Sequence, residues 1–275
     1  VQLVDREVTE SFGYLDPWTI TNYGGWTVHD VDGAETFELS GISFDHEGEA
    51  FGFIVANPEV AGIDTEVRPG FAPHTGKQYM MSVASSPYYC PEGHNDDWLV
   101  TPKLSGKAQT ISFYGLSYSD QDGNDEFEML YSTSGTKPDD FTLLDYVKVD
   151  NLDWTRYEAK VPDGTQYFAI RVISSNCVAF LIDDVCYKRA PLTIKNYNIW
   201  RDNILVGTAP ADALSYIDDK AEDGSHKYAM TIVYTEGESC LSDQREIITT
   251  GIGHVEIAGA KILGMNGAIL FAGIA

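Results

Sequence analysis

Apolar and polar residues alternate with a period of two along most of the chain, and convincing helical periodicity is absent. A period of two is typical of β-strands, because successive side chains point to opposite faces. Turn dipeptides such as Asp32-Gly33, Thr75-Gly76 and Asp163-Gly164 separate these segments. The pattern predicts an all-β protein. The expected strands are residues 36–42, 50–56, 78–84, 98–101, 109–118, 126–132, 156–161, 166–174 and 178–187.

The segment 166–173 is apolar at nearly every position, which indicates a central strand covered on both faces. Nine or ten strands joined by long irregular connections at 57–76 and 85–97 are typical of a jelly-roll β-sandwich of the galactose-binding-like kind. The first 188 residues are expected to form this domain. A charged pair followed by proline, at 188–191, then predicts a boundary.

A second module is expected at 191–250, where aromatic and apolar residues again alternate with polar ones. Asp202-Asn203 and Asp223-Gly224 supply its hairpin turns. A smaller immunoglobulin or fibronectin type III-like sandwich is the simplest interpretation. In residues 251–275, charged residues interrupt the apolar runs well before the ~20 residues that a membrane-spanning helix requires. This segment is therefore expected to form a β tail interrupted by glycines.

Two adjacent carboxylates, Asp183 and Asp184, interrupt the apolar strand 178–187. Alternation along a strand predicts that they point to opposite faces, so one of them is expected on a buried face. An unpaired buried carboxylate costs several kcal/mol. A hard, oxygen-liganded ion such as calcium would meet that charge. The alternative is that the strand ends there and both carboxylates are solvated or accept backbone N–H bonds.

The chain has 275 residues, 18 Lys+Arg against 42 Asp+Glu, and a net charge of -24. This charge disfavours nucleic acid and anionic membranes as partners and is compatible with divalent cations. The four cysteines are widely spaced and form no C-x-x-C pair, so they do not fix the compartment or their own pairing. No basic and apolar leader begins at Val1, so any export signal is expected to have been removed or never present.

Four segments in the first 187 residues carry a resemblance to a known family: 10–12, 96–103, 131–135 and 180–185. In order and spacing they resemble the cleaved-adhesin or choice-of-anchor jelly rolls of Bacteroidetes surface proteins. The resemblance implies a structural calcium held by Glu10 with Asp183 or Asp184. The acidic, glycine-rich loop usual after the first strand is replaced here by 22–26. Asp30 and Asp32, which arrive later, complete the candidate ligands.

The second module resembles the fibronectin type III-like repeats that follow such jelly rolls, most clearly at 197–202. It is shorter than those repeats, and the two strands that normally open the sandwich are missing. The tail could supply them. Residues 253–262 also resemble the start of a cell-surface sorting domain.

Other candidate sites have ordinary structural explanations. The acidic loop 120–126 could bind calcium, but it fails the EF-hand pattern and also suits a solvated hairpin. Cys90 and His94 could form a thiolate–imidazole pair, and Glu126 and Glu128 could serve glycoside hydrolysis, although the two glutamates share one strand face. The histidine spacing disfavours zinc. The aromatic residues near loops that could stack on sugars are Trp18, Trp26, Tyr88, Tyr89 and Tyr118.

The sequence therefore predicts a non-catalytic, secreted or surface-attached adhesin module. Its larger domain would be stabilised by structural calcium, and it would recognise a host extracellular protein or glycan. The alternative is a set of accessory domains of a secreted peptidase or glycosidase whose catalytic domain lies outside this chain. A chain that is itself a hydrolase is the third interpretation.

Overall fold

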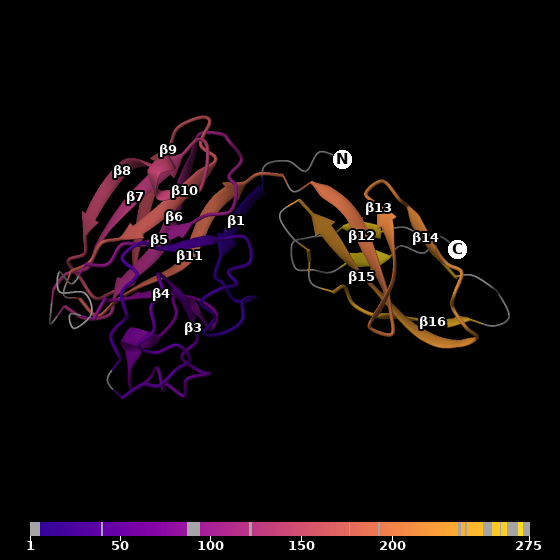
Figure 1. The fold of residues 1–275 in the computed structure, drawn as a ribbon, viewed down its shortest axis with the longest axis horizontal. Helices are drawn as coiled ribbons and strands as arrows, with labels where there is room; N and C mark the ends of the chain where they lie inside the picture. Colours follow the sequence, from indigo (N-terminus) through magenta and orange to yellow (C-terminus); the bar gives the residue numbers. More distant parts are fainter. Residues whose placement is uncertain are drawn as a thin grey trace. The chain divides into compact units, whose positions relative to one another are not determined.

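The computed structural model describes residues 6–39, 41–86, 94–120, 123–175, 177–191, 193–235, 238–239, 241–249, 255–258, 260–262 and 269–271. The chain divides into two compact units, Val1–Pro191 and Leu192–Ala275. Figure 1 shows the strands of both units. The described residues contain no helix of the length and apolar character that a membrane crossing requires.

Two antiparallel sheets form the larger unit (Figure 1). The first has the strand order β3-β4-β11-β6-β9, with β1 also paired to β11, and the second has the order β2-β5-β10-β7-β8. This is the jelly-roll sandwich expected from the strand pattern. The bounds in the first sheet are β1 Arg6–Glu10, β3 Ile54–Ala56, β4 Tyr79–Val83, β6 Gln109–Ser117, β9 Thr155–Val161 and β11 Ala179–Arg189; those in the second are β2 Thr27–Asp30, β5 Asp97–Val100, β7 Glu126–Ser132, β8 Thr142–Lys148 and β10 Tyr167–Val172.

Alternation along β11 explains why the larger unit has two apolar cores. Phe180 and Ile182 belong to the main cluster, which also includes Phe127 and Phe168 of the second sheet. Leu181 points to the other face and joins a separate cluster that the loop residues Trp18, Leu39 and Phe71 cover. The first sheet is therefore apolar on both faces, because long loops cover the face that the second sheet does not.

The central position expected for the segment 166–173 agrees with the sheet order, since β10 lies between β5 and β7. Phe168 and Ile170 face the main core. Ala169 lies on the other face, in a small cluster with Trp98 and Leu130.

The prediction of a strand at 36–42 was wrong, because the described residues of this segment form no strand and Thr36 makes only an isolated bridge, with Ser85. Its Leu39 is buried in the second core, with Phe37 and Ile42 packed against it, so burial without pairing produced the alternation. The structure also has three strands in this unit that the sequence did not predict: β1, β2 and β8. In β8 most side chains are exposed, which removes the contrast between faces that a sequence pattern needs.

The smaller unit has a four-stranded sheet of order β13-β12-β15-β16 and two two-stranded sheets. Strand β17, from the tail, pairs with β14, so the tail supplies backbone hydrogen bonds to an edge of this module. The bounds are β12 Ile194–Arg201, β13 Ile204–Pro210, β14 Ser215–Asp218, β15 Gly224–Tyr234, β16 Arg245–Thr249, β17 Val255–Ala258, β18 Ala260–Ile262 and β19 Ile269–Phe271.

Candidate metal centre

Three carboxylates gather at one end of the second sheet. Asp30 ends β2 and lies directly opposite Asp97, which begins β5, in the antiparallel register. Asp32 follows in the turn after β2, and one of its oxygens accepts the Asp96 backbone N–H at 2.7 Å. One oxygen from each of Asp30, Asp32 and Asp97 lies within 4.8 Å of the others. Strand pairing and the turn therefore bring together acids that are distant in sequence.

Neutral donors surround the most deeply buried member of this acidic group. Asp97 is 2% exposed. Its Oδ2 accepts hydrogen bonds from the Ser82 hydroxyl at 2.7 Å and from the Asn95 amide at 3.0 Å. Burial raises the pKa of Asp97 well above its ordinary value, and the charges of Asp32 and Asp30 add to that effect. The geometry therefore concentrates negative charge, and no cationic side chain of the described residues forms an ion pair with Asp30, Asp32 or Asp97.

The Asp30 carboxyl is shifted in the same direction. Burial raises its pKa, the backbone N–H of Gly33 opposes this as a donor to Oδ1 at 2.7 Å, and the Asp32 and Asp96 charges raise the pKa further. Three neighbouring carboxylates that are partly removed from water repel one another unless protons or a cation reduce their charge.

The donor set fits calcium better than a transition metal. Calcium takes oxygen ligands at ~2.3–2.6 Å, so two of its ligands can lie up to roughly 5 Å apart. The ligand oxygens of the three carboxylates, all within 4.8 Å of one another, satisfy this limit. The group contains neither histidine nor cysteine, the ligands that zinc favours. Asp30, Asp32 and Asp97 would hold the ion, whose chemistry would be charge neutralisation.

Asp30 and Asp32 were expected from the sequence as metal ligands, but Asp97 was not. Its expected strand began one residue later, at Trp98, so Asp97 was left in the preceding connection. The signal was present, because Asp96-Asp97 is a pair of adjacent acids directly beside an apolar strand, as Asp183-Asp184 is. Treating the two pairs alike would have identified Asp97.

The Asp183–Asp184 pair lies at a β-bulge in β11, where the register with β6 shifts between Asp183 and Cys186. Asp184 has a φ of 46°, in the left-handed region. Along one edge of β11, residues up to Ile182 pair with β4 and residues from Val185 pair with β1. The two acids occupy the interval between these partner strands. Bulges leave residues unpaired and redirect their side chains.

The prediction that the side chains of Asp183 and Asp184 point to opposite faces was wrong. Both carboxylates bind Thr75, whose backbone N–H donates to Asp183 Oδ2 at 3.0 Å and whose hydroxyl donates to Asp184 Oδ1 at 2.7 Å. His74 Nδ1 lies 2.6 Å from Asp184 Oδ2, and the Asp184 backbone N–H donates to Asp183 Oδ1 at 2.8 Å. The bulge turns both side chains toward one loop, and each of the four carboxylate oxygens has a protein partner.

Burial is the main cause of the shifted pKa of Asp183. The residue is 0% exposed. Its pKa is raised to about 7, chiefly by burial and also by the neighbouring charge of Asp184, while the hydrogen bond from the Thr75 N–H opposes the shift. His74 is fixed beside the pair, because its ring stacks on Tyr114 with centroids 3.6 Å apart.

Glu10 has partners of its own. Its Oε1 accepts the Phe12 backbone N–H at 2.7 Å, and burial raises its pKa against that hydrogen bond and the nearby charge of Arg189. Within the described ranges, the single group of three metal-ligating side chains is Asp30, Asp32 and Asp97. A calcium ion shared by Glu10 with Asp183 or Asp184 stays a prediction.

The loop 120–126 was expected either to bind calcium or to be a solvated hairpin. Asp125 fits neither interpretation, because its side chain is buried and only 1% exposed. Asp125 accepts hydrogen bonds from the hydroxyls of Ser117 at 2.5 Å and Ser174 at 2.6 Å, so this side chain points into the protein. Burial raises its pKa. Loop acids with buried polar partners cannot be recognised from spacing alone, because the partners come from other strands.

The remaining candidate residues form ion pairs, are buried, or lie outside the residues that the structure describes. Glu126 pairs with Lys148 at 2.7 Å, and Glu128 pairs with Arg171 at 3.0 Å. Trp18 and Trp26 are buried in the cores, whereas Tyr118 is half-buried. Tyr88, Tyr89 and Cys90 lie outside the described residues. Cys177 and Cys186 are free thiols.

The larger unit is therefore a jelly-roll β-sandwich with a group of three carboxylates at one end of its second sheet. No family model matches the chain. Its larger part is homologous to Porphyromonas gingivalis hemagglutinin A, with 24% identity over 205 residues, 66% of this chain and 9% of that protein. Lys-gingipain W83 of the same organism is also 24% identical over 205 residues, covering 66% of this chain and 12% of that protein. The chain thus spans about a tenth of these relatives.

A solved structure has the same fold. The K2 cleaved adhesin domain of Lys-gingipain superposes with a TM-score of 0.50 and 18% identity, covering 66% of this chain and 99% of that domain. The resemblance to cleaved-adhesin domains expected from the four sequence segments is confirmed. The matched share of this chain is close in length to the larger unit.

Proposed function

We propose that this chain is a non-catalytic binding module, secreted or attached to the cell surface, that recognises an extracellular host protein or glycan. The observation that carries the proposal is the 205-residue alignment with hemagglutinin A and Lys-gingipain. The shared fold of the K2 adhesin domain supports it. The name of hemagglutinin A refers to agglutination, and the name of the K2 domain refers to adhesion.

The ion pairs of Glu126 and Glu128 argue against a glycoside hydrolase site at these two carboxylates of β7. Glu126 accepts hydrogen bonds from Lys148 and from the Tyr146 hydroxyl, and these bonds, chiefly the one from Lys148, lower its pKa against the opposing effect of burial. A general acid for glycoside hydrolysis needs a raised pKa and an opposing carboxylate. Glu128 shares the Arg171 guanidinium with Asp96.

Binding of the whole chain to extracellular targets tests the proposal. The chain is immobilised and exposed to erythrocytes, to purified extracellular-matrix proteins and to a glycan array, with the heat-denatured chain as control. Saturable binding to at least one target without turnover of peptide or glycan substrates is the expected result. Absence of binding to every target, or hydrolysis that purifies with the chain, overturns the proposal.

Calcium at Asp30, Asp32 and Asp97 is the second part of the proposal, supported by the spacing and the raised pKa values of the group. Calorimetric titration of the calcium-free chain should give a binding isotherm. Asp30→Asn removes one charge and keeps the shape, and should weaken binding about tenfold or more, since affinity depends on the number of charged ligands. Asp45→Asn, an exposed acid of the same unit, is the matched control. Equal affinity in both variants would exclude this site.

An accessory role in a longer protein is the second candidate, and the small share of the relatives that the chain covers, 9% and 12%, favours it. In that case the segment would direct or anchor a peptidase or glycosidase encoded beside it. Sequencing of the flanking gene discriminates the two, because a catalytic domain there would favour the accessory role.

A further inference from the structure

An open pocket of about 400 Å³ lies in the larger unit, lined by Arg68, Pro69, Gly70, Tyr118, Ser119, Asp120 and Leu152. These residues come from three places: the short turn before Phe71, the segment that follows β6, and the connection between β8 and β9. None of them belongs to the acidic group or to the Asp183–Asp184 pair. Small-molecule sites are typically ~300–1,000 Å³, so the pocket is large enough for a small ligand.

The aromatic wall of the pocket is fixed in place. The Tyr118 backbone N–H donates to the Ala179 carbonyl at 2.9 Å, which extends the pairing of β6 with β11. The ring packs on Phe71 with centroids 4.4 Å apart. A Cβ on Gly70 would lie 3.4 Å from the Tyr118 ring, so the backbone of the turn is in contact with that ring. A rigid, half-buried aromatic ring with polar neighbours can pack against the C–H face of a ligand.

Arg68 is exposed, and none of its side-chain nitrogens has a hydrogen bond or an ion pair with another described residue. The exposed Lys77, Lys148 and Arg156 all pair with glutamates. Arg68 instead lies over Gly41, where a Cβ would be 3.2 Å from its Nη2. The donors of this guanidinium remain available to a ligand.

Asp120 supplies a negatively charged hydrogen-bond acceptor in the same pocket. It is exposed, and among the described ranges it forms no ion pair with Arg68. The pocket thus presents planar N–H donors, a carboxylate acceptor and an aromatic ring around one space. Sugar hydroxyls both donate and accept hydrogen bonds, and a pyranose ring has an apolar face. The charged lining disfavours a purely apolar ligand, while Asp120 and the net charge disfavour an anion.

We infer that this pocket binds a neutral pyranose sugar, with the ring against Tyr118 and its hydroxyls hydrogen-bonded to Arg68 and Asp120. The inference rests on the proposed function, of which it specifies the glycan alternative and the place of binding. The polar groups would orient the sugar, and the aromatic contact would supply apolar burial, as is usual in small-molecule sites.

Saturation-transfer NMR on the full chain tests the inference with defined probes. These are the methyl glycosides of galactose, mannose and glucose, N-acetylglucosamine, and N-acetylneuraminic acid as the anionic comparison. At least one neutral probe should bind and the anionic probe should bind more weakly. Arg68→Ala and Asp120→Ala should each weaken binding of that probe about five- to tenfold, the effect of losing one hydrogen bond of ~1 kcal/mol.

Arg156→Ala is the matched control, because Arg156 is an exposed arginine of the same unit that pairs with Glu158 outside the pocket. It should leave affinity unchanged, and circular dichroism should show all three variants folded. The inference is overturned if no neutral probe binds, or if Arg68→Ala and Asp120→Ala bind the probe as the parent does. Binding of a matrix protein or erythrocytes that persists in both pocket variants would preserve the proposed function while excluding this pocket.

Discussion

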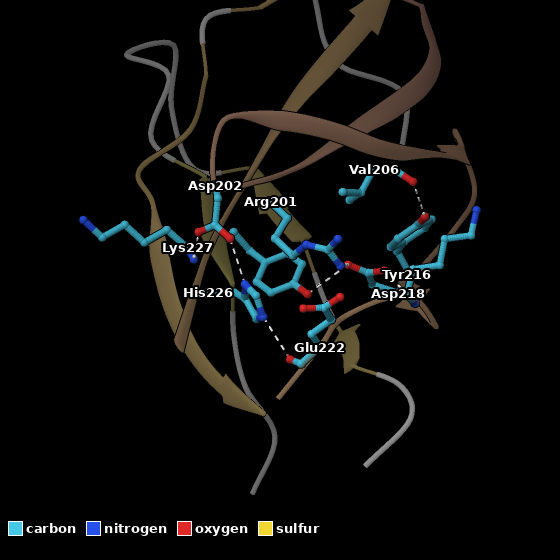
Figure 2. Close-up of polar contacts among 10 residues, drawn as sticks. Arg201, Asp202, Val206, Tyr216, Asp218, Glu222, His226 and Lys227 are labelled. Carbon is cyan, nitrogen blue, oxygen red and sulfur yellow. Dashed lines mark hydrogen bonds and ion pairs between the residues drawn. The ribbon is translucent and has the colours of Figure 1, made fainter. Parts of the chain in front are cut away.

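The two units of the chain differ in the groups that contact their buried carboxylates. In the larger unit, neutral hydroxyls, amides and backbone N–H groups are the hydrogen-bond donors to Asp97, Asp125 and Asp183. In the smaller unit, Asp218 is 2% exposed and pairs with the Arg201 guanidinium at 2.5 Å, while the Tyr228 hydroxyl donates to the same oxygen at 2.9 Å. Figure 2 shows Arg201 and Asp218 directed at each other.

This difference determines what each unit requires from solution. An ionised carboxylate with neutral donors alone stays costly to bury, so a proton or an external cation stabilises it. A carboxylate paired with an internal guanidinium carries its own compensation, but it becomes an unpaired charge when the arginine is lost. The larger unit should therefore respond to pH and calcium, and the smaller unit to loss of its arginine.

Replacing Arg201 should have the largest effect. Arg201→Ala leaves Asp218 buried without its cation, which should destabilise the smaller unit by about 3–5 kcal/mol. Hydrogen-exchange mass spectrometry of the full chain can measure this as faster exchange in β12 and β15, with no change in β10 or β11 of the larger unit. The double variant with Asp218→Asn removes the charge and should recover part of the protection. Unchanged exchange in Arg201→Ala would show that the ion pair contributes nothing.

Acid should stabilise the larger unit through Asp183. Its pKa is about 7 in the folded protein against an ordinary value of 3.8, so the folded state holds a proton that the unfolded state releases. Stability should fall as pH rises from about 4 to about 7, by about 2–4 kcal/mol given ~1.4 kcal/mol for each pH unit. Urea unfolding of the calcium-free chain at several pH values measures this slope.

Asp183→Asn should flatten that slope, whereas Asp45→Asn should leave it intact. An Asn at 183 cannot titrate and keeps one oxygen for the Thr75 N–H. Stability that rises with pH across this range in the parent chain would contradict the expected direction. The same slope in Asp183→Asn would assign the titration to Asp97 or Asp125, whose pKa values burial also raises.

The alternation of side chains predicted most of the sandwich but few of the contacts among its acids. Segments 109–118 and 126–132 were placed correctly as β6 and β7, because alternate residues of each, such as Phe113 and Phe127, face the main core. Adjacent acids marked Asp183-Asp184 as exceptional. Their donors could not be predicted, because Thr75 lies 108 residues earlier and the bulge that turns both acids toward it leaves no sequence pattern. Asp97 needed the register of β2 against β5.

Calcium should sharpen the comparison, because the proposed site lies in the larger unit alone. At a calcium concentration ~100 times the dissociation constant, binding to the folded state adds about 2.7 kcal/mol. For a unit of this size, that corresponds to a rise in melting temperature of roughly 5–10 °C. Differential scanning calorimetry should show this rise in the parent, and a smaller one in Asp30→Asn.

Exchange in β12 and β15 of the smaller unit should be the same with and without calcium. A chelator should abolish the rise in melting temperature, and magnesium at the same concentration should reproduce little of it, since Mg²⁺ demands a tighter octahedral geometry. Equal stabilisation of both units would mean that calcium acts by general screening of the charge of -24 and not at Asp30, Asp32 and Asp97.

The smallest expected effect concerns His226 in the smaller unit, whose positive charge depends on pH. His226 Nδ1 lies 2.8 Å from Asp202 Oδ2, and Nε2 lies 2.9 Å from the Glu222 carbonyl, as Figure 2 shows. Both neighbours are acceptors, so only the doubly protonated ring donates to both. The hydrogen bond to Asp202 is the main reason that the pKa of His226 is raised above 6.5.

This contribution to stability should be complete below pH 6.5 and should be lost as pH rises through the raised pKa, the same sign as for Asp183 but from a base. NMR titration of the His226 ring measures it. Asp202→Asn should lower the pKa of His226 toward 6.5, and asparagine suits the left-handed backbone of this turn, where Asp202 has a φ of 51°. An unchanged His226 pKa in that variant would show that Asp202 does not stabilise the charge of His226, and Arg201–Asp218 would then be the single ion pair among the described residues of the smaller unit.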